Sequence, residues 1–234
     1  MSFVLRSLRL LSTKPKALVR GPRWLLKKAV AELLFERQKM TEVELVSCLT
    51  GAGKDDVLRC WDEGREVPWP LLYAIARLSR PATVVETGVA SGGSSFSILQ
   101  ALADNGEGLL YSIELGGAKK FDSSGLTFYA PPDEEVGSLV PRGLRDRWRL
   151  ILGDAREELP LLLSQLGPID VFLHDSLHTE EHMLFEYETA WPDLREGGYL
   201  LSDDVSFSFR EFATRVDRPY SCTGNIPRFG GIRK

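Results

Sequence analysis

Cysteine is scarce in this sequence, and the pattern of the few cysteines excludes two classes of protein. Among 234 residues there are three, Cys48, Cys60 and Cys222, which are widely separated. None belongs to a C-x-x-C pair and their number is odd, so neither a zinc site nor a disulfide framework is indicated. We therefore expect reduced structural cysteines and a cytoplasmic protein.

Long apolar runs and a surplus of positive charge are also missing. No apolar stretch approaches the roughly 18 residues that a membrane-spanning helix needs. The formal net charge is −4, which gives no reason to expect nucleic acid as a partner. With 43% hydrophobic and 26% charged residues, the chain has the composition of a globular protein that can bury a substantial core.

Acidic residues are absent from the first 30 positions, where eight Lys and Arg residues alternate with Leu, Val and Trp. This segment lacks the uninterrupted apolar core and the cleavage site of a secretory signal. We favour a helical arm that packs on its own domain or, in a homo-oligomer, on a partner subunit. Peripheral contact with an anionic membrane surface and an organelle transit peptide are the alternatives.

What the sequence does contain is a glycine-rich turn between an expected strand and an expected helix. Residues 82–86 are short, apolar and β-branched, which indicates a buried strand. Gly88, Ser91 and the pair Gly92-Gly93 follow, and glycine lets the backbone turn tightly and approach a ligand. Helical spacing resumes at Ser94. A strand, a glycine turn and a helix N-terminus together predict a cradle for an anionic or nucleoside ligand.

The residues of the turn argue against a dinucleotide. The second glycine of the G-x-G-x-x-G fingerprint is replaced by Ala90, and the next acid, Glu114, is further away than the fingerprint places it. Glu86 stands two residues before Gly88 and would repel a pyrophosphate. A cofactor that carries an ammonium group would tolerate it.

Strands and helices alternate from residue 82 onward, which predicts an α/β fold with a doubly wound, mostly parallel sheet. The expected strands are 84–86, 109–114, 150–152, 170–174 and 199–202, and the expected helices are 94–103, 156–166 and 179–190. Residues 1–65 are predicted to form a helical arm or cap, with helices over 24–35 and from Thr41, which would be an N-cap. Residues 66–234 would then form the α/β domain.

Three further segments carry expectations of their own. Gly197-Gly198 indicates a helix C-cap and a turn into the strand at 199–202. Residues 220–222 and 229–233 are expected to pair as antiparallel strands. Residues 116–147 look irregular, and an excursion of this length is usually a lid or a specificity loop, with disorder as the alternative.

Every strand of the predicted parallel sheet is followed by an acid or contains one at its end. These acids are Glu86, Glu114, Asp154, Asp175 and the pair Asp203-Asp204. Carboxylates brought together at one edge of a sheet repel one another, so a positive group should lie among them. An ammonium-bearing cofactor accounts for the first three, and the remaining three are the oxygen ligands that Mg²⁺ or Ca²⁺ prefers.

The pattern of an acid followed by x-G-x-x-x-G, from Glu86 to Gly92, resembles the first motif of the class I S-adenosylmethionine-dependent methyltransferases. The resemblance implies a seven-stranded Rossmann-like sheet with an N-terminal helical extension, and a methyltransferase domain over 66–234. It also implies that S-adenosylmethionine is bound by Glu86, Gly88, Ala90, Ser91, Ser94, Glu114, Gly153, Asp154 and Asp175.

The acids after the fourth and fifth strands form a pattern that resembles the metal-binding pattern of a narrower group. This group comprises the metal-dependent sugar and catechol O-methyltransferases and the cephalosporin-hydroxylase-like, or methyltransferase 24, proteins. This resemblance covers residues 84–205. It implies that Asp175, Asp203 and Asp204 bind Mg²⁺ or another divalent cation, and that His178 or Asp175 accepts the proton of the acceptor. The acceptor would be a hydroxyl group of a small molecule or sugar.

The histidines allow other interpretations. His174 lies on an expected strand and is predicted to be a hydrogen-bonded core residue, whereas His178 and His182 are spaced like a helical zinc pair. For these two we favour one base and one surface residue. A non-haem iron oxygenase with His174 and Asp175 as ligands is a rival function, although neighbouring strand residues point to opposite faces. A second rival is a non-catalytic nucleoside-binding module of a glycan or natural-product assembly complex.

Overall fold

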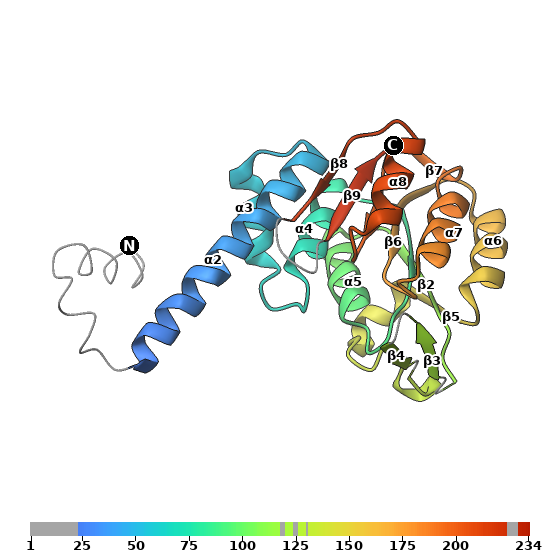
Figure 1. The fold of residues 1–234 in the computed structure, drawn as a ribbon, viewed down its shortest axis with the longest axis horizontal. Coiled ribbons are helices and arrows are strands. Elements are labelled where there is room, and N and C mark those ends of the chain that lie inside the picture. The colour runs from blue at the N-terminus through green and yellow to red at the C-terminus, as the bar shows by residue number, and fades with distance from the viewer. Residues whose placement is uncertain (1–22, 118–119, 124–125, 130, 224–228) are drawn as a thin grey trace. The chain divides into compact units, whose positions relative to one another are not determined.

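The computed structural model describes residues 23–117, 120–123, 126–129, 131–223 and 229–234 (Figure 1). The chain forms two compact units, residues 1–42 and residues 43–234. Our predicted boundary falls later, at residue 65. Residues 43–65 belong to the larger unit because Val43, Val46 and Val57 are fully buried in its hydrophobic core. The basic residues 1–22 lie outside the described residues, and none of the described helices is long and apolar enough to cross a membrane.

The first described helix, α2 (Arg23–Thr50), contains the expected helix over 24–35. It does not end before Thr41, so the prediction of a new helix capped by Thr41 is wrong. The Thr41 hydroxyl donates a hydrogen bond to the carbonyl oxygen of Gln38 at 2.7 Å. A threonine inside a helix satisfies its hydroxyl in this way, so it need not mark a helix start.

A seven-stranded sheet forms the centre of the larger unit, with strand order β5-β2-β1-β6-β7-β9-β8. Its strands are β1 (Thr83–Thr87), β2 (Leu109–Glu114), β5 (Trp148–Leu152), β6 (Ile169–His174), β7 (Leu194–Ser202), β8 (Tyr220–Cys222) and β9 (Gly230–Arg233). The first five pair in parallel, and β9 pairs antiparallel with both β7 and β8. The predicted doubly wound sheet and its closing antiparallel pair are therefore confirmed.

One strand begins earlier than expected. Gly197 and Gly198 lie inside β7, whereas the preceding helix ends at Ala190, so the prediction that they form a helix C-cap is wrong. The register between β6 and β7 shifts in this region, and Gly197 has a φ of +78°. A glycine inside a strand commonly marks such an irregularity because it tolerates the unusual backbone conformation.

Helices cover both faces of the sheet, and the sheet separates two hydrophobic clusters (Figure 1). One face carries α3 (Lys54–Glu63), α4 (Pro70–Ser79) and α5 (Gly93–Asn105), and the other carries α6 (Ala155–Leu166), α7 (Glu180–Ala190) and α8 (Phe207–Arg215). Fully buried side chains such as Leu99 and Phe172 belong to opposite clusters. Trp148 and Phe172 are core residues as well.

The excursion at 116–147 is more ordered than its sequence indicates. It contains a separate antiparallel pair, β3 (Lys120–Ser123) with β4 (Leu126–Tyr129), and two short 3₁₀ helices, Asp133–Glu135 and Arg142–Arg147. Val136, Val140 and Leu144 are buried in the core cluster on the α5 face. Residues 131–147 are therefore anchored to the core by three apolar side chains spaced four residues apart, and the roles of lid and specificity loop stay predictions.

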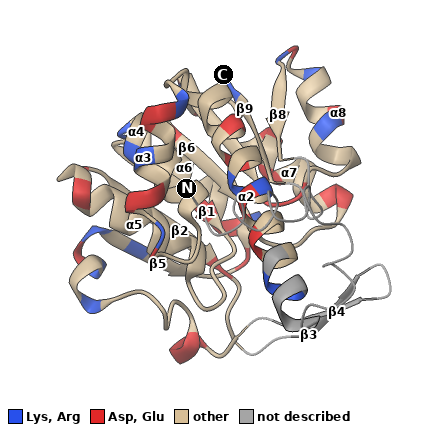
Figure 2. Cartoon of the chain, turned by 90° about the vertical axis from the view of Figure 1, so that its left-hand side faces the viewer, with Lys and Arg blue, Asp and Glu red and all other residues tan. Residues whose placement is uncertain are grey.

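The outer surface of the larger unit carries charges of both signs. Figure 2 shows acidic and basic segments interspersed on α3 and α4. Two of these charges, Lys54 and Arg59, form exposed ion pairs with Glu44 and Asp56. Exposed pairs of this kind contribute at most about 1 kcal/mol each, so the fold depends on its two clusters instead.

Candidate functional site

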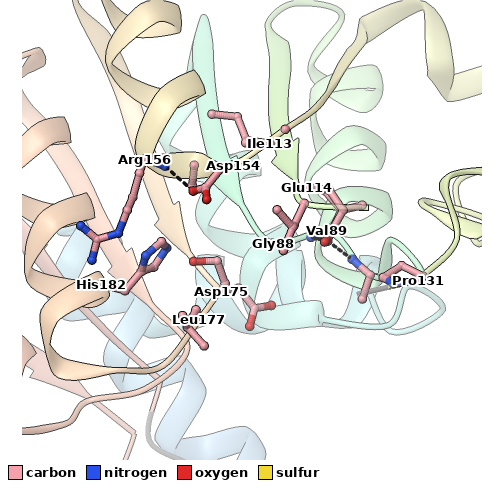
Figure 3. A pocket seen from close by; sticks show the side chains of 15 residues that line it. Gly88, Val89, Ile113, Glu114, Pro131, Asp154, Arg156, Asp175, Leu177 and His182 are labelled. Carbon is pink, nitrogen blue, oxygen red and sulfur yellow. Dashed lines mark hydrogen bonds between the residues drawn. The ribbon is translucent and has the colours of Figure 1, made fainter. Parts of the chain in front are cut away.

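A cavity of about 440 Å³ opens where the parallel strands end, at the edge of the sheet where α/β folds bind ligands. Its size is that of a pocket for a small molecule. Six of the nine predicted cofactor-binding residues line it: Gly88, Ala90, Glu114, Gly153, Asp154 and Asp175. Figure 3 shows Asp175 between Gly88 and Glu114 on one side and His182 on the other. Parallel strands thus bring together residues that are far apart in the sequence.

The glycine turn is fixed by close contact with the end of β6. Gly88 has a φ of +83°, and a side chain there would overlap the backbone carbonyl of Asp175. The backbone amide of Asp175 donates to the carbonyl of Thr87 at 2.9 Å. Gly88 is therefore required both by its conformation and by the approach of the neighbouring strand end.

Glu114 holds the rest of the turn. One oxygen of its carboxylate accepts hydrogen bonds from the backbone amides of Val89, at 2.7 Å, and Ala90, at 2.8 Å. The side chain lines the cavity although the residue is only 8% exposed. Ala90 adopts a φ of +47°, which is costly for a residue with a side chain. The two bonds to Glu114 stabilise this strained backbone.

Glu86 lies elsewhere. It is fully buried and does not line the cavity. One carboxylate oxygen accepts hydrogen bonds from the hydroxyls of Ser95 and Ser112, and the other has no partner among the described residues. Burial raises the pKa of Glu86 to about 7 despite these bonds. Ser91 and Ser94 do not line the cavity either, so the cofactor contacts assigned to these three residues stay predictions.

Asp154 lies both at the N-terminus of a helix and at the cavity. It is the N-cap of α6, where its carboxylate accepts the backbone amide of Arg156 at 2.9 Å (Figure 3). It also lines the cavity. A carboxylate has further lone pairs beyond the one used in capping, so the same side chain is able to bind a ligand.

Three side chains form a candidate cation group beside the cavity. Ligand atoms of Asp175, His178 and Asp203 lie within 4.8 Å of one another. The structure brings together two of the three predicted metal ligands and adds His178. Asp204 does not belong to this group among the described residues. Its backbone carbonyl accepts the Ser202 hydroxyl at 2.8 Å.

The electrostatics of this group favour a positive ligand. Burial and the nearby carboxylate of Asp203 raise the pKa of Asp175 well above its ordinary value. Burial also raises the pKa of Asp203. Burial, together with the proximity of His174, lowers the pKa of His178, so its imidazole is neutral and keeps a lone pair at neutral pH. A bound cation would compensate the carboxylates and accept that lone pair.

His174 and His182 are both tied to one acid that the sequence analysis missed, Glu186 on α7. The Nδ1 atom of His174 lies 2.6 Å from one Glu186 oxygen, and the Nε2 atom of His182 lies 2.8 Å from the other. His174 is thus a hydrogen-bonded core residue, as predicted. His182 is 6% exposed and lines the cavity, so the expectation of a surface residue is wrong for it.

His178 and His182 do not form a helical pair, since α7 begins at Glu180 with Thr179 as its N-cap. The spacing of His182 and Glu186, four residues apart on one helix, was the available signal for Glu186. Burial alone would raise the pKa of Glu186, but hydrogen bonds from His174 and His182 lower it well below its ordinary range.

Comparisons with known proteins agree with this geometry. A family model described as a methyltransferase domain, methyltransferase 24, matches residues 85–205. The curated protein sequences contain no match. Several solved structures share the fold.

The crystal structure of the O-methyltransferase from Bacillus cereus with S-adenosylhomocysteine is 12% identical, with a TM-score of 0.53, over 82% of this chain and 90% of that one. The O-methyltransferase TomG from Streptomyces achromogenes, in complex with S-adenosylmethionine, is 20% identical, with a TM-score of 0.53, over 74% and 79%. The apo structure of CalS11, a TDP-rhamnose 3′-O-methyltransferase of calicheamicin biosynthesis, is 15% identical, with a TM-score of 0.53, over 83% and 93%.

Proposed function

The chain belongs to the methyltransferase 24 family, whose domain covers more than half of its length, and from this premise we propose that it methylates a hydroxyl oxygen with the assistance of a divalent cation. The expected identification as a class I S-adenosylmethionine-dependent methyltransferase is confirmed by the family match and by the fold. The proposal extends this to the acceptor atom, the cation and the residues that act.

One observation carries the proposal: the glycine turn and the candidate cation group are in direct contact. Gly88 packs against the backbone of Asp175, whose carboxylate belongs to the cation group and also lines the cavity. Methyl transfer is an in-line displacement, so donor sulfur, methyl carbon and acceptor oxygen must be held in one line. A cofactor cradle that touches an acceptor-binding group meets this requirement.

The candidate group fits a small divalent cation. In an octahedral site with bonds of about 2.1 Å, opposite ligand atoms lie about 4.2 Å apart, which the spacing within 4.8 Å accommodates. Two carboxylates suit Mg²⁺, and the added imidazole widens the choice to metals such as Mn²⁺. When bound at Asp175, His178 and Asp203, the cation would lower the pKa of an acceptor hydroxyl and orient it.

The side chains around the cavity have distinct proposed roles. Glu114 has the position to accept hydrogen bonds from ribose hydroxyls, and Asp154 from an adenine amino group. His178 is neutral, and its buried Nε2 atom makes no hydrogen bond among the described residues and lies 3.9 Å from Oδ1 of Asp175. That nitrogen either binds the cation or takes the acceptor proton, and in the first case Asp175 is the remaining base.

A vicinal diol of a sugar or a catechol is the acceptor that we propose, because two neighbouring oxygens bind one cation in a fixed orientation. A protein of the same fold, CalS11, is a TDP-rhamnose 3′-O-methyltransferase. This likeness at 15% identity supports the fold and leaves the acceptor to be tested directly.

The test combines binding and turnover. We expect S-adenosylhomocysteine to bind in calorimetry, and a panel of catechols and nucleotide sugars to include an acceptor that is methylated when Mg²⁺ or Mn²⁺ is present. Removing metal with EDTA should abolish turnover and leave cofactor binding intact. Undiminished turnover without metal would refute the cation, and binding without turnover on any acceptor would favour the non-catalytic module.

A single substitution tests the role of the candidate cation group separately from cofactor binding. Asp203→Asn should lower turnover at least a hundredfold and weaken Mn²⁺ binding, while the affinity for S-adenosylhomocysteine changes less than threefold. Glu196→Gln is the control on β7, the strand that directly precedes Asp203, since that side chain is 77% exposed and only approaches Arg218 at 3.6 Å. Equal effects of the two substitutions would contradict the assignment of Asp203.

A further inference from the structure

Glu186 is the most highly hydrogen-bonded buried carboxylate next to the site. It is 0% exposed, and its two oxygens accept four hydrogen bonds. One oxygen accepts hydrogen bonds from Oγ1 of Thr87 at 2.5 Å and Nδ1 of His174 at 2.6 Å. The other accepts from Oγ of Ser176 and Nε2 of His182, both at 2.8 Å. Every bond comes from a side chain, and the four donors lie on three different segments.

Two of these segments position the glycine turn and the candidate cation group. Thr87 is the last residue of β1 and directly precedes Gly88. His174 and Ser176 flank Asp175 on both sides. Since Glu186 contacts the residue before Gly88 and both neighbours of Asp175, one side chain of α7 fixes the glycine turn and the cation group relative to each other.

A carboxylate is required for this arrangement by its chemistry. Only an ionised carboxylate accepts four bonds without offering a hydrogen of its own. Glutamine at this position would turn its NH₂ group toward one hydroxyl and one imidazole, and both would have to change from donor to acceptor to keep their bonds. Burying such a charge is costly, and an apolar residue of similar size would often stabilise the fold as well or better. The retained charge therefore indicates a role beyond packing.

We propose that Glu186 is a positioning residue for methyl transfer, which holds the cofactor turn after β1 and the Asp175 segment after β6 in the separation that the reaction needs. This inference rests on the proposed function. Glu186 does not line the cavity, so it acts through Thr87, His174 and Ser176.

The experiment compares two Glu→Gln substitutions on α7, with S-adenosylhomocysteine as the calorimetric probe. Glu186→Gln should leave a folded protein by near-ultraviolet circular dichroism and weaken binding at least tenfold. Glu188→Gln is the matched control, because that side chain is 52% exposed and pairs with Arg215 on the surface. Its affinity should stay within twofold of the wild type. Unchanged affinity in folded Glu186→Gln would overturn the inference.

A second variant keeps the test decisive if Glu186→Gln does not fold. Thr87→Val preserves the shape of the side chain and removes only the bond that joins Glu186 to β1. We expect it to weaken S-adenosylhomocysteine binding about fivefold, whereas a purely structural bond would lower the melting temperature and leave the affinity unchanged. That second result would overturn the inference. A wild-type protein that fails to bind the probe would instead overturn the proposed function itself, and the inference with it.

Discussion

At the scale of single residues, the structure separates two acids that the sequence places in the same role. Glu86 and Glu114 both stand near strand ends, yet only Glu114 lines the cavity. Glu86 pairs in register with Ser112, so Glu86 and Glu114 lie on the same face of the sheet, but Glu114 stands two residues further toward the carboxyl end of the strands. Glu86 enters the interior under α5, where it contacts Ser95 and Ser112.

The burial of Glu86 predicts an unusual dependence of stability on pH. Its pKa is about 7 in the folded protein, against an ordinary value of 4.5 in the unfolded chain. Between these values the folded state keeps a proton that the unfolded state has lost, so the free energy of unfolding falls as the pH rises, by about 1.4 kcal/mol per pH unit. The stabilisation is fully present below pH 4.5 and is lost as the pH rises through 7.

Glu86→Gln should remove this loss, because the amide stays uncharged. We expect the variant to gain on the order of 3 kcal/mol relative to the wild type between pH 4.5 and pH 8. Urea unfolding of both proteins at the two pH values measures the difference. A difference that is the same at both pH values would show that Glu86 is ionised in the folded protein throughout.

The glycine at position 88 gives a second prediction at this scale. In Gly88→Ala the new methyl group would overlap the Asp175 carbonyl, and the φ of +83° is unfavourable for alanine. We expect S-adenosylhomocysteine binding to weaken more than tenfold in calorimetry. Gly143→Ala is the control, since a methyl group there meets nothing within 4 Å, and its affinity should be that of the wild type.

At the scale of elements, the segment 131–147 supports the glycine turn. The backbone amide of Gly137 donates to the carbonyl of Ala90, and that of Leu139 to the carbonyl of Ser91, both at 2.9 Å. Arg145 in turn donates to the carbonyl of Gly137 at 3.0 Å. A segment tied to the turn by its backbone and to the core by its side chains is part of the scaffold of the site.

This role predicts different effects of two neighbouring truncations. Val140 is 3% exposed, so Val140→Ala leaves a cavity and should lower the free energy of unfolding by about 2 kcal/mol. Leu139 is 53% exposed, and Leu139→Ala should change it by less than about 0.5 kcal/mol. Urea unfolding provides both numbers. Equal, small effects would mean that the segment opens freely.

At the scale of the whole molecule, the two compact units differ in how they bury apolar surface. The larger unit contains both core clusters and the cavity, all within residues 43–234. In the smaller unit, α2 exposes Val30, Leu33 and Leu34 by 47% to 58%. The predicted contacts of the N-terminal arm, with its own domain, with a partner subunit or with an anionic membrane surface, stay predictions.

The division into units predicts that residues 43–234 fold on their own. We expect this fragment to give a single cooperative thermal transition and to bind S-adenosylhomocysteine within threefold of the full chain, because every residue lining the cavity lies in it. Sedimentation of the full chain and the fragment with phosphatidylserine vesicles then tests the membrane alternative. A fragment that does not fold would show that the first 42 residues complete the core.

The sequence by itself determined the local elements and their order. Three features depend on near neighbours in the chain: the strand, glycine turn and helix at 82–102, the alternation that follows, and the acids after successive strands. Parallel strands bring their carboxyl ends to one edge of the sheet, whatever the order of the strands. From these patterns the fold, the cavity edge and six of its fifteen lining residues were predictable.

Only the tertiary structure decided which side chains meet at that edge. Glu86 and Glu114 lie on one face of the sheet, and only Glu114 is far enough along its strand to reach the cavity. The choice of His178 over Asp204 beside Asp175 and Asp203, and the reach of Glu186 to three segments, depend on strand register and on how α7 packs against the sheet. The physical reason is that these contacts join residues far apart in the chain, and a shift of one residue in a strand reverses the face on which a side chain lies.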